Sequence, residues 1–188
     1  MITTIKAMGY RHTREEILDG ALAVAFDDGL SQLTYGRVAK RLGISDRVVV
    51  YYFASKAELV GEVLVSVGTQ FQRTLEPAFG SPARDHLQLL QAAWPIVAQA
   101  DADAVFALFF EANGLAAAGR EPYRTLVPQL VDAWITWAAE FFEGTEAERR
   151  TEAETAIALL DGLLLLRQLA GPAAASRAAM RIGVADRG

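Results

Sequence analysis

The sequence predicts an all-α protein made of a three-helix N-terminal domain and a larger helical C-terminal domain. Apolar residues recur at spacings of three and four along almost the whole chain, as on the buried face of an α-helix. Helix-start patterns also recur, with Ser or Thr followed three residues later by Glu, and Gly or Pro follows most apolar segments. No segment alternates apolar and polar residues as a half-buried β-strand would.

Composition limits the classes of function. The 188-residue chain is 52 % apolar and 22 % charged, so it can form a sizeable core. It has no cysteine, which excludes disulfides, thiolate nucleophiles and cysteine-bound metals. The start, Met1–Tyr10, lacks the apolar stretch of a signal peptide, and no apolar run reaches the roughly 20 residues of a membrane helix. We therefore expect a soluble, cytoplasmic protein.

The first 54 residues predict three helices. Residues 13–16 read Thr-Arg-Glu-Glu, the pattern of a capping box, and Gly29 stands where the left-handed residue after the first helix is expected. Thr34 and Ser45 can cap the two shorter helices that follow, and Gly43 lies in the turn between them. We expect these helices at about residues 13–28, 35–42 and 45–52.

A long helix opens the second domain. Residues 55–58, Ser-Lys-Ala-Glu, form another capping pattern, and Pro77 ends the apolar repeat. After a turn at residues 76–82 we expect further helices at about 83–100, 102–118, 121–143, 145–170 and 173–182. Pro95 and Pro128 fall inside two of them and should kink or restart each helix. The expected domains are residues 1–54 and 55–188.

Residues 34–53 have the pattern of a helix-turn-helix, whose second helix enters the major groove of DNA. Ala39 is small where the two helices cross, and Val49 and Phe53 should face inward. Although the net charge is −5, the window Thr34–Lys56 holds five basic residues and one acidic residue. A basic window on an acidic chain is typical of a protein that meets phosphate with one end only.

The segment Thr34–Leu59 resembles the DNA-binding domain of TetR-type bacterial regulators. The resemblance lies in Ala39, in Gly43-Ile44-Ser45 and in the run from Tyr51 to Lys56, and it covers about residues 11–65. It implies three helices for DNA binding and a helical domain for ligand binding and dimerisation. It also implies repression that a small molecule relieves, which is the usual behaviour in this family.

The resemblance also implies a set of DNA contacts. Thr34 would cap the second helix near a phosphate, and Ser45–Val48 would lie over base edges. Tyr51-Tyr52 falls in the aromatic segment that contacts the DNA backbone, and Lys56 would meet a phosphate. The family usually has a tyrosine where this chain has Val50, so that phosphate contact is lost or passed to Tyr51.

Side-chain chemistry ranks these candidates. Arg47 can pair bidentately with guanine, and Val48 can pack on a thymine methyl group. Asp46 can accept a hydrogen bond from a cytosine amine, or it can simply favour the positive N-terminus of its helix. The other basic residues of the window suit phosphates, which set register without reading sequence: Arg37, Lys40, Arg41 and Lys56.

Leucine-rich residues 157–166 predict a dimer interface. Four consecutive leucines surround a helix, so one face can bury in its own domain and the other needs a partner. The alternative is a central helix buried entirely in a monomer. A dimer would recognise a pseudo-palindromic operator. The predicted interface lies on the helices at 145–170 and 173–182, with the candidates Leu159, Leu160, Leu163, Leu164, Leu166 and Arg167.

The resemblance further implies a cavity for a largely apolar small molecule. Aromatic side chains of the second domain could line it, with two polar residues as contacts; ordinary core packing is the alternative for each. The candidates are Phe71, Trp94, Phe106, Phe109, Phe110, Glu111, Asn113, Trp134 and Trp137.

No pattern of an enzyme is present. His12 and His86 are the only histidines, and neither has metal-ligand spacing with acidic residues. No phosphate loop, nucleophile elbow or pair of catalytic carboxylates appears. The sequence therefore predicts no cofactor, no metal and no catalysis. A helical carrier that binds small molecules without binding DNA is the remaining alternative to a regulator.

Overall fold

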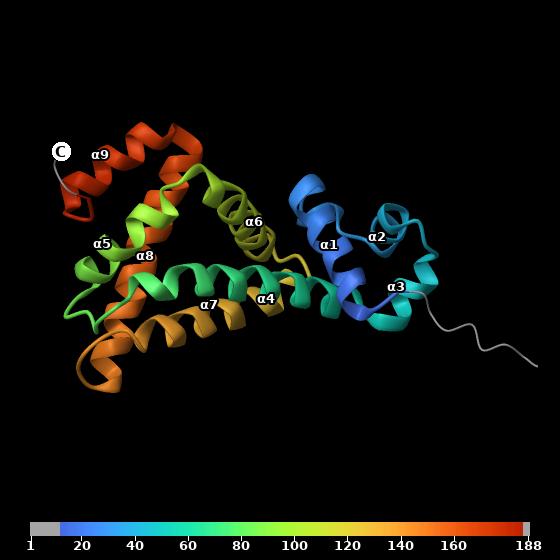
Figure 1. The fold of residues 1–188 in the computed structure, drawn as a ribbon, viewed down its shortest axis with the longest axis horizontal. Coiled ribbons are helices and arrows are strands. Elements are labelled where there is room, and N and C mark those ends of the chain that lie inside the picture. Colours follow the sequence, from blue (N-terminus) through green and yellow to red (C-terminus); the bar gives the residue numbers. More distant parts are fainter. Residues whose placement is uncertain (1–11, 186–188) are drawn as a thin grey trace, which may run out of the picture. The chain divides into compact units, whose positions relative to one another are not determined.

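The computed structural model describes residues 12–185, and these residues form the predicted all-α fold (Figure 1). Met1–Tyr10, on which the expectation of no signal peptide rests, lies outside the described residues. The first helices are α1 (Arg14–Asp28), α2 (Tyr35–Leu42), α3 (Asp46–Tyr52) and α4 (Lys56–Leu75). They are followed by α5 (His86–Val97), α6 (Ala100–Ala117), α7 (Tyr123–Ala139), α8 (Glu146–Ala170) and α9 (Pro172–Ile182).

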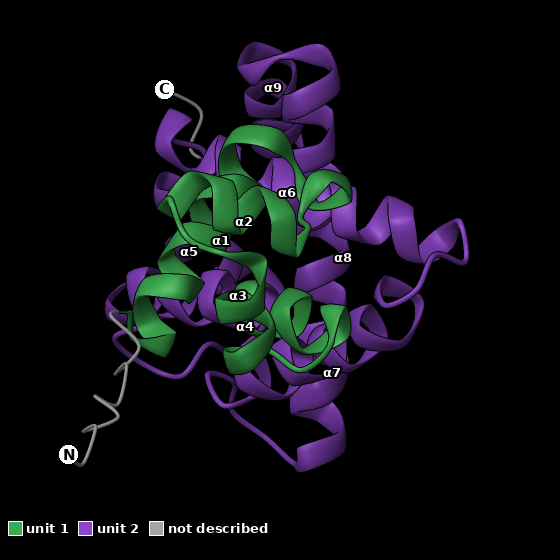
Figure 2. Cartoon of the chain, turned by 90° about the vertical axis from the view of Figure 1, so that its right-hand side faces the viewer, with its two compact units in different colours: residues 1–63 green, residues 64–188 purple. Residues whose placement is uncertain are grey.

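The chain divides into two compact units, one ending at Val63 and the other beginning at Leu64 (Figure 2). The division falls inside α4, so the first turns of this helix belong with α1, α2 and α3, and the rest belongs to the larger unit. The boundary expected between residues 54 and 55 lies just before the same helix. Leu59, Val60 and Val63 on the first turns are fully buried.

Local sequence sets the ends of the first helices. Thr13 Oγ1 accepts a hydrogen bond from the Glu16 N–H at 3.2 Å, and the Glu16 carboxylate accepts one from the Thr13 N–H at 2.9 Å. Gly43 has φ 66°, the left-handed conformation that ends α2. The Ile44 N–H then donates to the Ala39 carbonyl at 3.0 Å. The turn between α2 and α3 is therefore the one that the glycine predicts.

The first two helices approach closely because Gly20 has no side chain. A Cβ atom at this position would lie 2.8 Å from both Cγ and Cδ1 of Leu42 on α2. The residues that close the core of this unit are apolar and buried: Ile17, Ala21, Val24, Leu30, Leu33, Val38, Val49 and Phe53.

In the larger unit, α8 packs against α5, α6, α7 and α9. An ion pair also joins α8 to α6, because the Arg167 guanidinium donates to both carboxylate oxygens of Asp103, at 2.6 and 3.0 Å. α5 starts later than expected, since Asp85 caps it through the Gln88 N–H at 2.9 Å. Residue 83 pairs instead with the end of α7, where the Ala83 N–H donates to the Phe141 carbonyl at 2.7 Å.

The two internal prolines do not divide their helices, so the prediction that each could restart its helix is wrong. Pro95 lies in the last turn of α5, and Pro128 lies in the second turn of α7. A proline removes one backbone N–H donor and crowds the carbonyl four residues earlier. Near a helix end few backbone hydrogen bonds are affected, so packing of the remaining turns preserves the helix.

Among the described helices, none by itself is long and apolar enough to cross a membrane. Only α5 and α6 taken together satisfy the length and composition requirements, and that pair is bent by 109°.

The close approach of α1 and α2 predicts the effect of two glycine substitutions. Overpacking of the new methyl group in Gly20→Ala against Leu42 should cost about 1–3 kcal/mol. The better helix propensity of alanine returns about 1 kcal/mol, so the free energy of unfolding should fall by up to about 2 kcal/mol. Gly36→Ala on α2 is the control, since its Cβ would meet nothing within 4 Å. Denaturant unfolding followed by circular dichroism compares them; equal effects would contradict the close approach.

Candidate DNA-binding surface and ligand cavity

α3 is a short helix held by one buried face. Val49 and Phe53 are completely buried, and the Tyr35 hydroxyl donates to the Phe53 carbonyl at 3.0 Å. At the other end, Ser45 Oγ accepts a hydrogen bond from the Arg47 N–H at 3.3 Å. These contacts fix the rotation of α3 about its own axis, so they decide which residues point away from the unit.

The opposite face of α3 is open to solvent. Asp46 and Arg47 are exposed, and Val48 is half-buried. Val50 is 44 % exposed and Tyr51 is 63 % exposed, which is unusual for large apolar or aromatic side chains in a helix of this size. An exposed strip of one arginine, two valines and a tyrosine can offer both hydrogen bonds and apolar contacts to base edges.

Tyr52 has a different role from its neighbour. Its hydroxyl donates to the His12 carbonyl at 2.6 Å, just before α1 begins. The rings of Tyr51 and Tyr52 meet edge to face, with centroids 5.0 Å apart. Tyr52 therefore joins α3 to the start of α1 within its own unit, and Tyr51 is the more exposed of the two aromatic candidates for the DNA backbone.

The basic residues of the window fall into two groups. Arg37 pairs with Asp28 at 3.0 Å and Arg41 pairs with Asp27 at 2.6 Å, so the last two residues of α1 hold two arginines of α2. Lys40, Arg47 and Lys56 are exposed and form no ion pair with another described residue. From the sequence, Asp27 and Asp28 are predicted only to lie at the end of a helix, and their spacing indicates no partner.

The remaining polar candidates lie at helix starts. Thr34 Oγ1 accepts a hydrogen bond from the Arg37 N–H at 3.3 Å and is exposed, so it caps α2 as expected. Lys56 is the first residue of α4, next to Ser55, whose hydroxyl accepts a hydrogen bond from the Glu58 N–H at 3.0 Å. The N–H groups of helix N-termini favour nearby negative charge, including phosphate.

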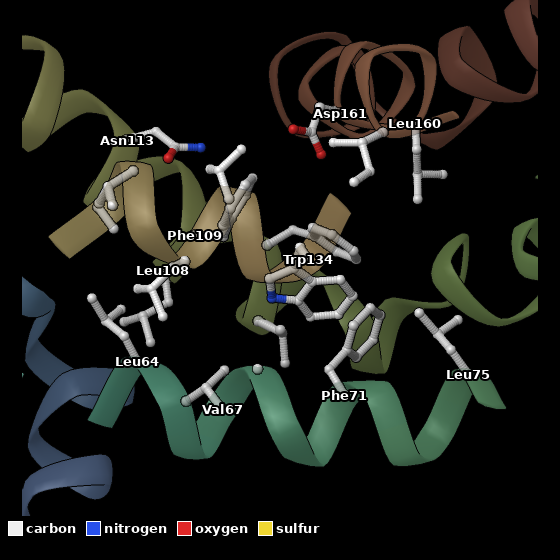
Figure 3. Close-up of a pocket in the computed structure, with 18 residues that line it drawn as sticks. Leu64, Val67, Phe71, Leu75, Leu108, Phe109, Asn113, Trp134, Leu160 and Asp161 are labelled. Atoms are coloured by element: carbon white, nitrogen blue, oxygen red, sulfur yellow. The ribbon is translucent and has the colours of Figure 1, made fainter. Parts of the chain in front are cut away.

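The larger unit contains a cavity of about 110 Å³ between α4, α6, α7 and α8 (Figure 3). Five of the residues expected to line a ligand site are in its wall: Phe71, Phe106, Phe109, Asn113 and Trp134. Gly68 is also in the wall, and a Cβ there would lie 3.3 Å from Trp134 Nε1. The absence of a side chain at this position lets the indole lie against α4.

The other four expected residues lie outside this wall. Trp94, on α5, is buried in the core of this unit. Trp137 packs on Phe141, with ring centroids 5.0 Å apart. Phe110 packs on Phe109, with centroids 5.5 Å apart. Glu111 lies near Tyr123, where burial, with a smaller contribution from Glu111, raises the pKa of Tyr123 to about 12. Helix periodicity could not separate these residues from the wall, because both sets lie on buried faces.

Sequence reasoning missed the one ionisable residue of the cavity. Asp161 reaches the wall from α8, and Asn113 reaches it from α6, on the side opposite the α4 side chains (Figure 3). Burial raises the pKa of Asp161 to about 6, from an ordinary value of 3.8. Its position inside a leucine-rich segment was the only available signal.

The leucine-rich part of α8 is divided among three environments. Leu163, Leu164 and Arg167 are buried in their own unit, and Leu160 lines the cavity. Leu159 is partly buried against the same core. Of the residues expected at a dimer interface, Leu166 is exposed, and three further apolar side chains are exposed near it in sequence or on the next helix. These are Leu165, Leu169 and Ile182.

The buried carboxylate predicts a pH-dependent effect of Asp161→Asn. The pKa of the acid is higher in the folded than in the unfolded chain, so ionisation destabilises the fold. This cost is complete above about pH 6 and disappears as the pH falls towards 3.8. Because Asp161 remains partly exposed, we expect the substitution to stabilise the protein by about 1–2 kcal/mol at pH 8 and by about half as much at pH 5. Denaturant unfolding at both pH values measures this, and a gain that is larger at pH 5 would contradict it.

Comparison with known proteins agrees with this arrangement. Residues 17–63 match the family model described as bacterial regulatory proteins, tetR family. No curated protein sequence matches the chain. A putative TetR-family transcriptional regulator from Rhodococcus sp. has a TM-score of 0.70 and 18 % identity, over 91 % of this chain and 97 % of that one.

Two other solved structures have the same fold. A putative transcriptional regulator from Streptomyces coelicolor A3(2) has a TM-score of 0.67 and 24 % identity, over 90 % of this chain and 97 % of that one. A putative transcriptional regulator from Saccharomonospora viridis, in complex with choline, has a TM-score of 0.63 and 20 % identity, over 91 % and 92 %.

Proposed function

We propose that this chain is a regulator of the tetR family, and specifically a homodimeric repressor that a small molecule releases from its operator; the match of residues 17–63 and the shared fold support this. Membership of this family would make the chain a DNA-binding transcription regulator instead of an enzyme, and the family match of the N-terminal residues and the fold both support this. The proposal adds the base contacts, the dimer, the repression and the cytoplasmic location, together with control by a ligand in the cavity.

The observation that carries the proposal is the two-sided character of α3. Val49 and Phe53 hold one face, and Arg47, Val50 and Tyr51 project from the other. In a helix-turn-helix, the second helix presents such a free face to the major groove. We assign Arg47 to a guanine, and Val48 and Val50 to thymine methyl groups.

We assign the phosphate contacts first to the basic side chains that form no ion pair with another described residue. Lys40 and Lys56 have no ion-pair partner among the described residues, so their charge is available to phosphate without breaking a contact. Arg37 and Arg41 would have to leave Asp28 and Asp27 first. An exposed ion pair contributes only about 0–1 kcal/mol, so DNA could compete for both arginines.

The dimer is proposed on the exposed side of α8 together with α9. Leu165 and Leu169 are four residues apart on one face of α8, and Leu169 is 78 % exposed. Apolar side chains gathered in this way are typical of a surface that another protein covers. Two copies would present two α3 helices to half-sites about one DNA turn apart, or a multiple of it.

Control by a ligand is proposed to act through α4. This single helix carries Val60 and Val63 in the core of the first unit, and Val67 and Phe71 in the wall of the cavity. A ligand that shifts α4 would change the separation of the two recognition helices in a dimer. The choline bound to the relative from Saccharomonospora viridis supports a small-molecule ligand here. Coupling is reciprocal, so operator DNA should weaken ligand binding by the same factor.

Two substitutions separate base reading from phosphate binding. Arg47→Ala should weaken operator binding by about 1–3 kcal/mol and relax specificity, because it removes a bidentate base contact. Lys56→Ala should weaken specific and non-specific DNA alike, and should reduce the slope of log affinity against log salt by about one. Fluorescence anisotropy in a salt series measures both, with operator DNA first selected from random fragments by the purified protein.

The same series tests the alternative of a helical carrier. A regulator has a steep slope, near −0.9 for each phosphate contacted, whereas a carrier has no salt-dependent DNA binding at all. If Arg47→Ala weakened specific and non-specific DNA binding equally, Arg47 would not be a base-reading residue.

The dimer surface predicts a change of mass in solution. The wild-type chain should sediment as a dimer at micromolar concentration, and the double substitution Leu165→Glu and Leu169→Glu should produce monomers, because four carboxylates would then meet in one apolar interface. Val65→Glu on α4 is the matched control, since Val65 is also an exposed apolar residue, at 50 %. A monomeric wild-type protein would exclude this dimer, and a control that dissociates equally would exclude this surface.

A further inference from the structure

Four of the eighteen residues that line the cavity are aromatic, and they come from three helices. Phe71 on α4 meets Phe106 on α6 edge to face, with ring centroids 5.1 Å apart, and lies 6.3 Å from the Trp134 ring on α7. Phe109 adds a further ring, and the remaining wall is mainly aliphatic. The face of an aromatic ring is electron-rich and attracts cations, most strongly when water is excluded.

One side chain of this wall can carry a charge. Asp161 makes no hydrogen bond or ion pair with another described residue. The nearest arginine along α8, Arg167, is already engaged by both oxygens of Asp103. The lining residues from α4, α6 and α7 include no acid and no base, and Asn113 is their only amide.

The Asp161 carboxylate lies in apolar surroundings without a basic side chain as its partner. Ionised groups in apolar surroundings are costly unless they are paired. Elsewhere in the same unit the acids that approach other helices do have partners, as Asp103 and Asp132 do with Arg167 and Arg150. Asp161 differs from them because it faces a cavity instead of a basic residue. A bound cation would supply the missing charge.

We propose that the cavity binds a small organic cation, with its positive charge beside Asp161 and its apolar body against Phe71, Phe109 and Trp134. This inference rests on the proposed function, since it names the chemical class of the effector. The size also fits. An engineered cavity of about 150 Å³ lined by apolar residues binds benzene, so a cavity of about 110 Å³ limits the enclosed apolar body to at most about one ring.

Binding of a cation should depend on pH through the same carboxylate. Burial raises the pKa of Asp161 to about 6, so the site is neutral in acid and negative above neutrality. No other titratable side chain faces the cavity from α4, α6 or α7. The affinity for a cation should therefore fall by up to about tenfold between pH 8 and pH 5, and the affinity for a neutral molecule of the same shape should not.

The test is calorimetric titration of the full chain without DNA. The probes are benzylammonium, which stays charged over this pH range, and benzyl alcohol, which has a similar shape and no charge. At pH 8 the wild-type protein should bind benzylammonium at least tenfold more tightly than benzyl alcohol. Asp161→Asn should abolish this preference and leave the binding of benzyl alcohol unchanged or tighter. Glu140→Gln, which removes an exposed carboxylate at the end of α7, should keep the preference.

The inference is overturned if the wild-type protein binds both probes equally or binds neither. It is also overturned if Asp161→Asn keeps the preference while circular dichroism shows that the variant is folded. Operator binding is measured separately, so the two proposals fail independently. Absence of the cation preference in the wild-type protein, with intact operator binding, overturns the cation site alone. A cation preference without salt-dependent DNA binding supports the cation site and overturns the regulator.

Discussion

The burial of one face of α3 is the constraint on which the candidate DNA-binding surface depends. A helix of seven residues has too few internal hydrogen bonds to persist alone, because nucleation is costly and few residues propagate it. Val49 and Phe53 supply the missing stability by complete burial, and the caps at both ends limit fraying. Since these two side chains fix the rotation of the helix, they also decide that Arg47, Val50 and Tyr51 project outward. The stability of α3 and its proposed recognition surface thus depend on opposite faces of the same few turns.

Features set by local sequence were predictable, and features set by packing were not. The bounds of α2 follow from Thr34 and Gly43, which act within a few residues of themselves. The start of α8 likewise follows from its capping box. The pairing of Asp27 with Arg41 depends on how α1 crosses α2, and no spacing along the chain encodes that angle. Pro128 leaves α7 undivided for a related reason, because tertiary packing outweighs a local preference.

The candidate ligand site illustrates the same limit more strongly. Periodicity identified the buried faces of α6 and α7, but burial in a core and exposure to a cavity have the same pattern in sequence. Phe109 and Phe110 are adjacent, and only the first lines the cavity. On α8, the leucine run divides between core, cavity and solvent, because a helix that packs on several neighbours has no single buried face. The position of Asp161 in the cavity wall is therefore evident only from the folded structure, in which α8 lies against its neighbours.

The ion pairs between the end of α1 and α2 have a consequence for selectivity among DNA sequences. Arg37 and Arg41 reach any duplex with their charges already neutralised by Asp28 and Asp27. If the proposed regulator uses Arg37 and Arg41 only in its operator complex, breaking each exposed ion pair there costs about 0–1 kcal/mol, and both arginines stay paired on random DNA. The two aspartates would thus compete with phosphate and weaken non-specific DNA binding. Non-specific sites are the main competitors of the operator for a regulator. Under the proposed function, Asp27 and Asp28 would in this way sharpen the choice of sequence.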